Sequence, residues 1–244
     1  MTKQLGATDI KAQKLRFHTQ TGGSTLTAQQ ALNNIPRVTL QAMSAVLGGT
    51  QSLHTNGYDE ALSLPTEEAA RIALRTQQII AFESGVTDTV DPLAGSYFVE
   101  TLTNEIEAAA WKYIEKIDAM GGAVTAIEAG YMQEEIARSA YTYQKEIESK
   151  EKIIVGVNSF KSAETRQTSL FKVDDEIRLV QMEKLKVLKN NRNAEAVRLA
   201  LAEISHCAKA NINLMPSVIS AVEHGTTLGE ISDALRAIFG EYRG

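Results

Sequence analysis

The sequence predicts an α/β protein in which a short strand–helix–strand segment is followed by a long, mostly helical remainder. Two observations support this fold class. Before about residue 60, glycines and β-forming residues are concentrated, and residues 14–20 and 50–54 both read as strands. After that point, apolar residues recur three and four positions apart over long stretches, as expected for amphipathic helices.

The first strand candidate, residues 14–20 (KLRFHTQ), ends at a turn that contains two glycines. Helical periodicity over residues 27–47 predicts a helix, which Gly48 and Gly49 terminate. Pro36 lies inside this span, and a proline within a helix removes a backbone hydrogen bond. We therefore expect either a kink at Pro36 or a loop followed by a shorter helix that begins there.

The second strand candidate, residues 50–54 (TQSLH), leads into a polar loop at residues 55–60. A structured loop is expected at residues 86–97 and a third strand at residues 153–160 (IIVGVNSF). Thr227 and Glu230 are spaced as a capping box that starts the final helix. Helices are expected at residues 65–84, 100–120, 123–129, 131–147, 174–190, 194–210, 215–223 and 227–239.

Composition narrows the range of partners. The formal net charge of −5 and the pI of about 5.5 predict no nucleic-acid partner. Cys207 is a single cysteine, which excludes an internal disulfide and fits a reducing compartment, and the histidines are not at metal-ligand spacing. No window approaches about eighteen uninterrupted apolar residues, and the N-terminus lacks the apolar segment of a secretory signal. We therefore expect no membrane partner and a cytoplasmic location.

Polar side chains gather at the end of each predicted strand. In parallel α/β proteins, functional side chains lie at the C-terminal ends of strands, because the loops that follow form a crevice there. Arg16, His18 and Gln20 are two residues apart, so they are expected on one strand face as candidates to line one cavity. The alternative is that His18 and Gln20 only satisfy backbone groups.

The second polar group follows the strand at residues 50–54. Its histidine, His54, is a candidate general base or metal ligand, although a buried histidine hydrogen-bonded to the structure is commoner. Asp59 and Glu60 suit hydrogen bonds to sugar hydroxyls, or equally a cap for the next helix. Neither glycine pair of this region fits a phosphate-binding fingerprint. The whole group consists of Gln51, Ser52, His54, Asn56, Asp59 and Glu60.

Two long segments closely resemble the large, catalytic subunit of the methylmalonyl-CoA mutase family. They are RFHTQTGGSTLTAQQ and GGTQSLHTNGYDEALSLPTEEAARIALRTQQIIAFESGVTDTVDPLAGSYFVE, and the resemblance continues through IIVGVNSF to the terminal TLGEISDALRAIFGEYR. The family fold is a (β/α)₈ TIM barrel that threads acyl-CoA along its axis and stacks adenosylcobalamin against its C-terminal face. By this resemblance, the chain is the C-terminal portion of that barrel, with its last two strands followed by a mostly helical wrap.

The resemblance also implies a division of the chain into three parts. Residues 1–64 would form the end of the barrel substrate domain, with its last two strands and loops. Residues 65–160 would form a helical wrap that closes the barrel, and residues 161–244 a helical C-terminal subdomain.

Three residues resemble the family's substrate contacts. His18 resembles the histidine that contacts the thioester arm of CoA. Gln51 and Ser52 resemble the pair that hydrogen-bonds the pantetheine chain. The substrate implied is a short acyl-CoA, but the residues that would select among acyl-CoA molecules lie upstream of this sequence in the family.

Three further residues resemble the family's cofactor contacts. Gln20 resembles the glutamine at the cobalamin face, while Asn56 and Glu60 resemble the residues that hold the adenosyl group. These are binding and positioning roles, and the resemblance assigns no catalytic residue and no metal ligand to this chain. In the family, the cofactor performs the radical chemistry and the protein orients and contains it.

The sequence also departs from the family pattern. Six barrel strands are missing, and Glu223, His224 and Gly225 are the nearest approach to the family's D-x-H-x-x-G cobalt-ligand motif. We therefore expect a second chain carrying the front of the barrel, and a cobalamin-binding subunit that supplies the cobalt ligand. The position of Met1 suggests a split gene, an internal start or a truncated gene model.

Two functional hypotheses follow from the sequence. The first is part of an adenosylcobalamin-dependent acyl-CoA mutase, an isomerase of the intramolecular-transferase class, which is incomplete as this chain alone. The second is a non-catalytic module or remnant of such a mutase, whose helices from Pro65 onward dock another subunit. The intact set of polar residues at the two strand ends favours the first, because a docking module has no physical need for them.

Overall fold

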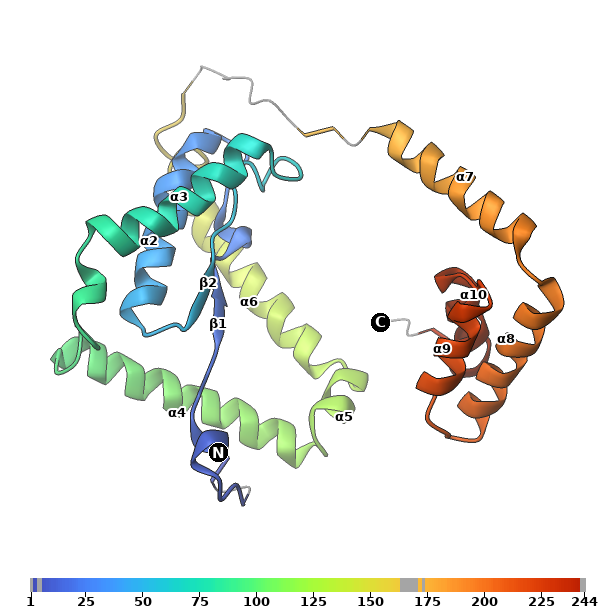
Figure 1. Ribbon diagram of the computed structural model, residues 1–244. Helices are drawn as coiled ribbons and strands as arrows, with labels where there is room; N and C mark the ends of the chain where they lie inside the picture. Colours follow the sequence, from blue (N-terminus) through green and yellow to red (C-terminus); the bar gives the residue numbers. More distant parts are fainter. Residues whose placement is uncertain (1, 4–5, 163–170, 173, 242–244) are drawn as a thin grey trace. The chain divides into compact units, whose positions relative to one another are not determined.

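The computed structural model describes residues 2–3, 6–162, 171–172 and 174–241, which form two units (Figure 1). The first unit is Met1–Phe171 and the second is Lys172–Gly244. The first contains the predicted strands, and the second consists of helices joined by short loops in its described residues. The fold class is confirmed as a mostly helical α/β chain with a small parallel sheet. These units do not test the three-part division, which stays a prediction.

The sheet of the first unit consists of two short parallel strands joined through a helix. Strand β1 (His18–Gln20) pairs with β2 (Ser52–His54), so that His18 lies opposite Ser52 and Gln20 opposite His54. Parallel strands require a crossover connection, and α2 (Asn34–Leu47) supplies it. Both predicted strands are therefore confirmed, although each is only three residues long.

Pro36 does not kink the predicted helix. Instead, a loop is followed by a shorter helix, which is the second outcome expected from the sequence. A loop and the 3₁₀ turn η2 (Ala31–Asn33) precede α2, which places Pro36 in the first helical turn. The backbone N–H groups of that turn have no intrahelical partner, so proline removes no hydrogen bond there. The buried Asn34 side chain fixes this start, because its Nδ2 donates to the carbonyl oxygens of Thr27 at 2.9 Å and Tyr58 at 2.8 Å.

Helices α2 and α3 (Glu67–Glu83) pack against each other and form the helical layer beside the sheet (Figure 1). Thr55, which follows β2, donates its hydroxyl to the carbonyl oxygen of Ala73 in α3. Because side chains alternate along a strand, this contact places odd-numbered β2 side chains toward the helices and even-numbered ones away from them. The buried residues of this layer include Ala31, Tyr58 and Ala69, with Ile35, Leu62 and Ile72 packed against them.

The remaining helices of the first unit confirm the predicted ones with shifted ends. The largest shift is at the start of α4, which includes three residues before the predicted start at residue 100. Neither α4 nor α6, whose residues are all described, contains a buried side chain. The other short elements are α1 (Ile10–Gln13), η1 (Gly23–Thr25) and η3 (Val86–Asp88), and the helices are α4 (Tyr97–Ala119), α5 (Ala123–Glu128) and α6 (Tyr131–Glu148).

The predicted strand at residues 153–160 is wrong. This segment forms turns and a single isolated bridge between Val155 and Ser159. Its polar side chain, Asn158, accepts the N–H of Ile154 at 2.7 Å and donates to the carbonyl oxygen of Lys152 at 2.7 Å. These local bonds use the backbone groups that a strand would pair with a neighbour. The segment also docks on the start of α2, where Arg37 donates to the Val155 carbonyl oxygen at 2.8 Å.

The second unit confirms all the helices predicted for it. Ile204, Ala221 and Ile231 form its buried core, and the predicted capping box of Thr227 and Glu230 is present. None of the residues of α7, all of them described, is buried. The helices are α7 (Asp175–Asn191), α8 (Ala194–Lys209), α9 (Met215–Glu223) and α10 (Leu228–Phe239).

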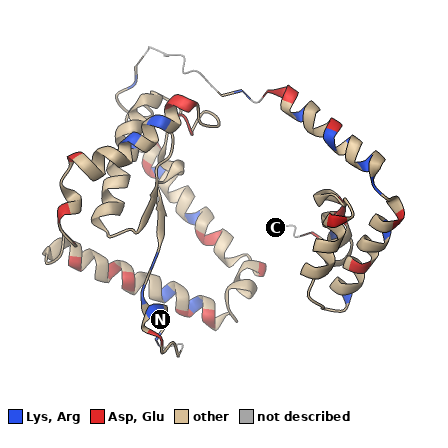
Figure 2. Ribbon diagram, viewed as in Figure 1, with Lys and Arg blue, Asp and Glu red and all other residues tan. Residues whose placement is uncertain are grey.

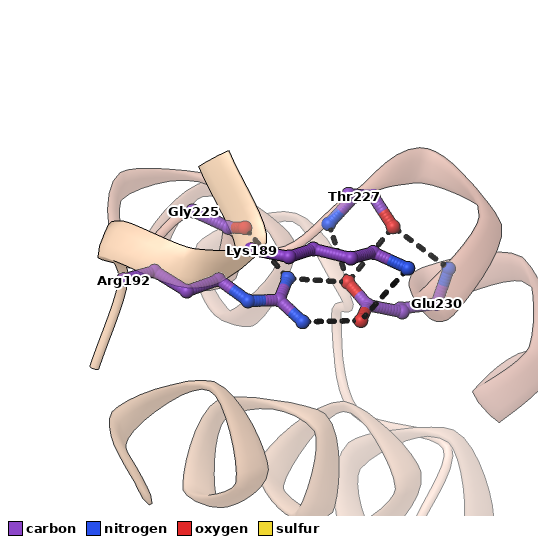
Figure 3. A network of polar contacts seen from close by, with 5 residues as sticks. All are labelled: Lys189, Arg192, Gly225, Thr227 and Glu230. Atoms are coloured by element: carbon purple, nitrogen blue, oxygen red, sulfur yellow. Dashed lines mark hydrogen bonds and ion pairs between the residues drawn. The ribbon is translucent and has the colours of Figure 1, made fainter. Parts of the chain in front are cut away.

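A charged network closes the start of α10 (Figure 3). Arg192 makes two bonds to the Glu230 carboxylate, at 2.6 Å and 2.5 Å, and a third to the carbonyl oxygen of Gly225 at 2.9 Å. The same carboxylate accepts the backbone N–H and the hydroxyl of Thr227, at 2.9 Å and 2.8 Å. The Arg192 hydrogen bonds, ahead of those from Thr227, hold the pKa of Glu230 well below its usual range.

Acidic and basic side chains are interspersed along the helices of each unit (Figure 2). Among the helices that the structure describes, none is long and apolar enough to cross a membrane.

Candidate functional site

One face of the two-stranded sheet carries only polar side chains. His18 and Gln20 of β1 and Ser52 and His54 of β2 project from the face opposite α2 and α3, and all four are exposed. The intervening residues, Thr19 and Leu53, are half-buried on the helical side. The strand alternation predicted from the sequence is therefore confirmed for His18 and Gln20, which share this face.

His18 and Ser52 form one side-chain pair across the two strands. Their Cα atoms are in register, and Nδ1 of His18 and Oγ of Ser52 share a short hydrogen bond. The family resemblance assigns both residues to the substrate side of the site. The structure therefore brings together two residues that lie 34 positions apart in the sequence.

Gln51, the third residue assigned to the substrate, is bonded to the backbone at both ends of its amide. Its Oε1 accepts the N–H of Phe17 at 2.8 Å, and its Nε2 donates to the carbonyl oxygen of Gly49 at 2.9 Å. These bonds tie the start of β2 to the residue before β1. The predicted contact of Gln51 with a ligand stays a prediction, and it requires at least one of these bonds to be exchanged.

Gln20 and Asn56 form a second polar pair, at the C-terminal ends of the strands. Nε2 of Gln20 donates to Oδ1 of Asn56 at 3.1 Å. Asn56 is 2% exposed, and its Nδ2 donates to the Thr21 carbonyl oxygen at 2.9 Å while its backbone N–H donates to the Thr21 hydroxyl at 3.0 Å. Asn56 is therefore fixed in place and in turn orients the exposed amide of Gln20.

Glu60 joins this pair because Gly23, a turn residue after β1, has no side chain. A Cβ atom added to Gly23 would lie 2.3 Å from Oε1 of Glu60 and 3.1 Å from Nδ2 of Asn56. Glycine is therefore required at position 23 for the exposed Glu60 carboxylate to lie against this turn. The available signal was a glycine pair directly after a polar strand end, but its contact partner lies 37 positions away, at Glu60.

Asp59 follows the capping alternative that the sequence left open, whereas the ligand contact of Glu60 stays a prediction. Asp59 is fully buried, and its Oδ2 accepts the N–H of Thr66 at 2.9 Å and the Thr66 hydroxyl at 3.0 Å. Thr66 is the N-cap residue of α3, so Asp59 supports the cap of the next helix. Burial raises the pKa of the neighbouring Tyr58, as do the charges of Glu68 and Asp59, so its hydroxyl stays protonated at neutral pH.

The buried-histidine alternative for His54 is wrong, and Arg16 lies outside the paired residues of β1. The His54 side chain is exposed and makes no hydrogen bond with any residue that the structure describes, so it is not a buried structural histidine. Arg16 precedes the first paired residue of β1 and is also exposed. Among the described residues, no three His, Cys, Asp or Glu side chains are grouped so that they could hold a metal ion.

The site therefore consists of two adjoining parts. The His18–Ser52 pair lies toward the N-terminal end of the strands, and the cluster of Gln20, Asn56 and Glu60 lies toward the C-terminal end. Its chemistry is that of hydrogen-bond donors and acceptors plus one carboxylate, which suits hydroxyl, amide and heterocyclic groups of a ligand. A separate cavity of about 590 Å³, lined by residues that include Arg37, contains none of the predicted site residues.

Comparison with known proteins identifies the family. The sequence model of the family described as methylmalonyl-CoA mutase matches residues 1–241. A 2-hydroxyisobutanoyl-CoA mutase large subunit of Aquincola tertiaricarbonis is 43% identical over 245 residues, covering 100% of this chain and 44% of that protein. The methylmalonyl-CoA mutase of Escherichia coli (strain K12) is 44% identical over 238 residues, covering 97% of this chain and 33% of that protein.

A mitochondrial methylmalonyl-CoA mutase of Mus musculus is 41% identical over 235 residues, covering 96% of this chain and 31% of that protein. The chain thus spans less than half the length of each of these relatives. The matched segment nevertheless includes both strands and both parts of the polar site. The chain belongs to the methylmalonyl-CoA mutase family.

Proposed function

We propose that this chain is the part of an adenosylcobalamin-dependent acyl-CoA mutase that contributes the last two strands of a TIM barrel. The observation that carries this proposal is the uncovered polar face of the sheet, with its two sets of side chains at the strand ends. Parallel sheets are normally covered on both faces, and functional residues of barrels lie at the C-terminal ends of strands. Family membership supports the reaction class.

The two parts of the site have separate roles in this proposal. His18, Ser52 and Gln51 bind the acyl-CoA substrate, with the imidazole and hydroxyl placed side by side across the strands. Gln20, Asn56 and Glu60 hold the adenosyl group of the cofactor. The substrate side therefore precedes the cofactor side along both strands.

The residues present fit an adenosyl group. The absence of a Cβ at Gly23 leaves the Glu60 carboxylate beside the Asn56 amide, so acceptors and donors converge at one place. Amide and carboxylate groups match the hydroxyls of a ribose and the nitrogens of an adenine. When bound, adenosylcobalamin supplies radical chemistry through cleavage of its cobalt–carbon bond. The residues of this chain bind and orient, and the cobalt ligand comes from another domain or subunit.

The proposal requires partners. Among the described residues, each strand of the sheet has one neighbour only, which leaves one edge of each strand unpaired. We propose that a chain carrying the front of the barrel pairs with these edges, that a cobalamin-binding subunit covers the strand ends, and that the assembly is cytoplasmic. The substrate is a short acyl-CoA, and the named relatives include mutases of both methylmalonyl-CoA and 2-hydroxyisobutanoyl-CoA.

A docking module without catalysis is the second candidate function. Large apolar side chains of α4, including Tyr97, Phe98 and Ile106, are 93%, 74% and 61% exposed. Such a surface is typical of a helix that packs against another chain. This surface is also compatible with the mutase assembly, so the two candidates differ only in whether the polar sheet face binds ligands.

Co-purification and ligand binding together test the proposal. The tagged chain is recovered from its native cells, and its partners are identified by mass spectrometry. We expect a barrel-front chain and a cobalamin-binding subunit, and the Gln20→Ala and Glu60→Ala complexes should bind adenosylcobalamin more weakly than wild type. Glu223→Ala, an exposed carboxylate in the second unit, is the matched control. Recovery of neither partner, or unchanged cofactor affinity in both site variants, contradicts the proposal.

A further inference from the structure

His54 is the one member of the polar sheet face without a side-chain partner among the described residues. His18 bonds Ser52, and Gln20 bonds Asn56. His54 is exposed, and its ring nitrogens form no hydrogen bond or ion pair with any described residue. An imidazole has one ring N–H and one ring acceptor to satisfy when it is neutral. Its partner must therefore be water, a ligand or a group of the proposed barrel-front chain, and the position of His54 favours a ligand.

The register of the strands places His54 on the cofactor side of the site. Its Cα atom lies opposite that of Gln20, whereas His18 lies opposite Ser52. Two residues of extended chain separate it from Ser52 on one side and from Asn56 on the other, a distance of roughly 6.6 Å in each direction. His54 therefore lies at the junction between the two parts of the site, level with the first residue of the cofactor cluster.

Packing within the described residues gives the His54 side chain no structural role. The neighbouring residue on the strand, Leu53, is half-buried toward the helices, and Thr55 is buried and bonded to Ala73 of α3. His54 projects away from this layer. A polar side chain that stabilised the fold would be expected to bond to it, as Asn56 and Asp59 do.

We propose that His54 is a further cofactor-binding residue, whose imidazole hydrogen-bonds the adenosyl group held by Gln20, Asn56 and Glu60. This inference rests on the proposed function. It assigns His54 to the cofactor rather than to the acyl-CoA, because its cross-strand neighbour is Gln20. A ribose hydroxyl or an adenine nitrogen offers the complementary donor or acceptor.

Affinity measurements on the assembled complex test this assignment. The dissociation constants of adenosylcobalamin and of methylmalonyl-CoA are measured by calorimetry for wild type, His54→Ala and His54→Gln. We expect His54→Ala to bind adenosylcobalamin about tenfold more weakly, the effect of one lost hydrogen bond, with partial recovery in His54→Gln. Affinity for methylmalonyl-CoA should not change. His206→Gln is the matched control, since His206 is an exposed histidine on α8 of the second unit.

A spectroscopic readout separates ligand contact from a change in folding. In a complex whose histidines are isotopically labelled only in this chain, the ring signals of His54 should shift when adenosylcobalamin is added. The signals of His206 and His224, neither of which has a role in the proposed site, should stay in place. The spectrum of the His54→Gln variant assigns the His54 signal.

Each outcome bears on a different claim. Unchanged adenosylcobalamin affinity in His54→Ala, with Gln20→Ala weakened, overturns the assignment of His54 and leaves the proposed function standing. A loss confined to methylmalonyl-CoA affinity also overturns it, because His54 would then belong to the substrate side. A wild-type complex that binds neither ligand overturns the proposed function itself and this inference with it.

Discussion

The start of α10 and the polar face of the sheet contain similar side chains, but these side chains have different roles. At α10, Arg192, Thr227 and Lys189 surround the Glu230 carboxylate. On the sheet face, the His54 side chain has no hydrogen-bond partner among the described residues, and the exposed Gln20 and Glu60 lie at the edge of a fixed cluster. Polar groups whose bonds are completed internally stabilise a fold, whereas groups held in place but left open can bind a ligand.

The largest expected effect is on the closed network. Glu230→Ala removes the partner of Arg192 and the capping box of α10, so it should destabilise the second unit by about 3 kcal/mol. Hydrogen exchange of peptides from α8 and α10 measures this change. Glu195→Ala, which breaks only the exposed pair with Arg198, is the control and should alter exchange little. Equal protection in the two variants would contradict a stabilising role for the network.

Asn56→Ala should have the next largest effect, on the first unit. It leaves the Thr21 carbonyl without its buried donor and costs about 2 kcal/mol. Ser52→Ala, on the exposed face of β2, should cost less than about 0.5 kcal/mol. The stability losses of the two variants are measured by urea unfolding, with hydrogen exchange of the strand peptides as the readout. Equal losses in both variants would show that the buried cluster and the open face do not differ as described.

Acidification should weaken the second unit through Glu230. Its pKa is lowered in the folded state, so its stabilisation is complete above the ordinary carboxyl pKa and is lost as pH falls below it. The expected loss is about 1 kcal/mol between pH 7 and pH 4, and it should be absent in Glu230→Gln. The free energy of unfolding is measured for wild type and for Glu230→Gln across this pH range. The same pH dependence in both proteins would contradict the prediction.

Gly23→Ala should have the smallest effect on stability and a measurable one on cofactor affinity. The added Cβ displaces Glu60, whose carboxylate is exposed, so the fold is little affected while adenosylcobalamin binding weakens about fivefold. Gly229→Ala is the control, because a Cβ there meets no atom within 4 Å. An unchanged affinity in Gly23→Ala would mean that Glu60 does not need its observed position.

Much of the helical structure follows from the sequence because its signals are local. The apolar periodicity of α3 and the capping box of Thr227 and Glu230 are each contained within one helix. The strand predicted at residues 153–160 was wrong, because their β-branched side chains favour a strand whereas Asn158 stabilises turns. The short lengths of β1 and β2 were also not predictable, since strand pairing ends where the partner strand ends.

The candidate site was predictable in outline and not in its contacts. Strand alternation and strand-end position placed His18 and Gln20 together, and the resemblance added their partners across the sheet. The engagement of Gln51 with the backbone and the contact of Gly23 with Glu60 depend on register and on turn geometry over more than thirty residues. Neither property is encoded in a local pattern, so neither could be read from the sequence.

Isomerase activity of the native complex tests the central claim most directly. Methylmalonyl-CoA and 2-hydroxyisobutanoyl-CoA are each incubated with the complex, with and without adenosylcobalamin, and the rearranged acyl-CoA is quantified by mass spectrometry. We expect cofactor-dependent isomerisation of one of them, strongly reduced in a Gln20→Ala, Glu60→Ala double variant and unchanged in Glu223→Ala. Isomerisation of neither substrate, or full activity in the double variant, would contradict the claim that this polar sheet face is part of a mutase active site.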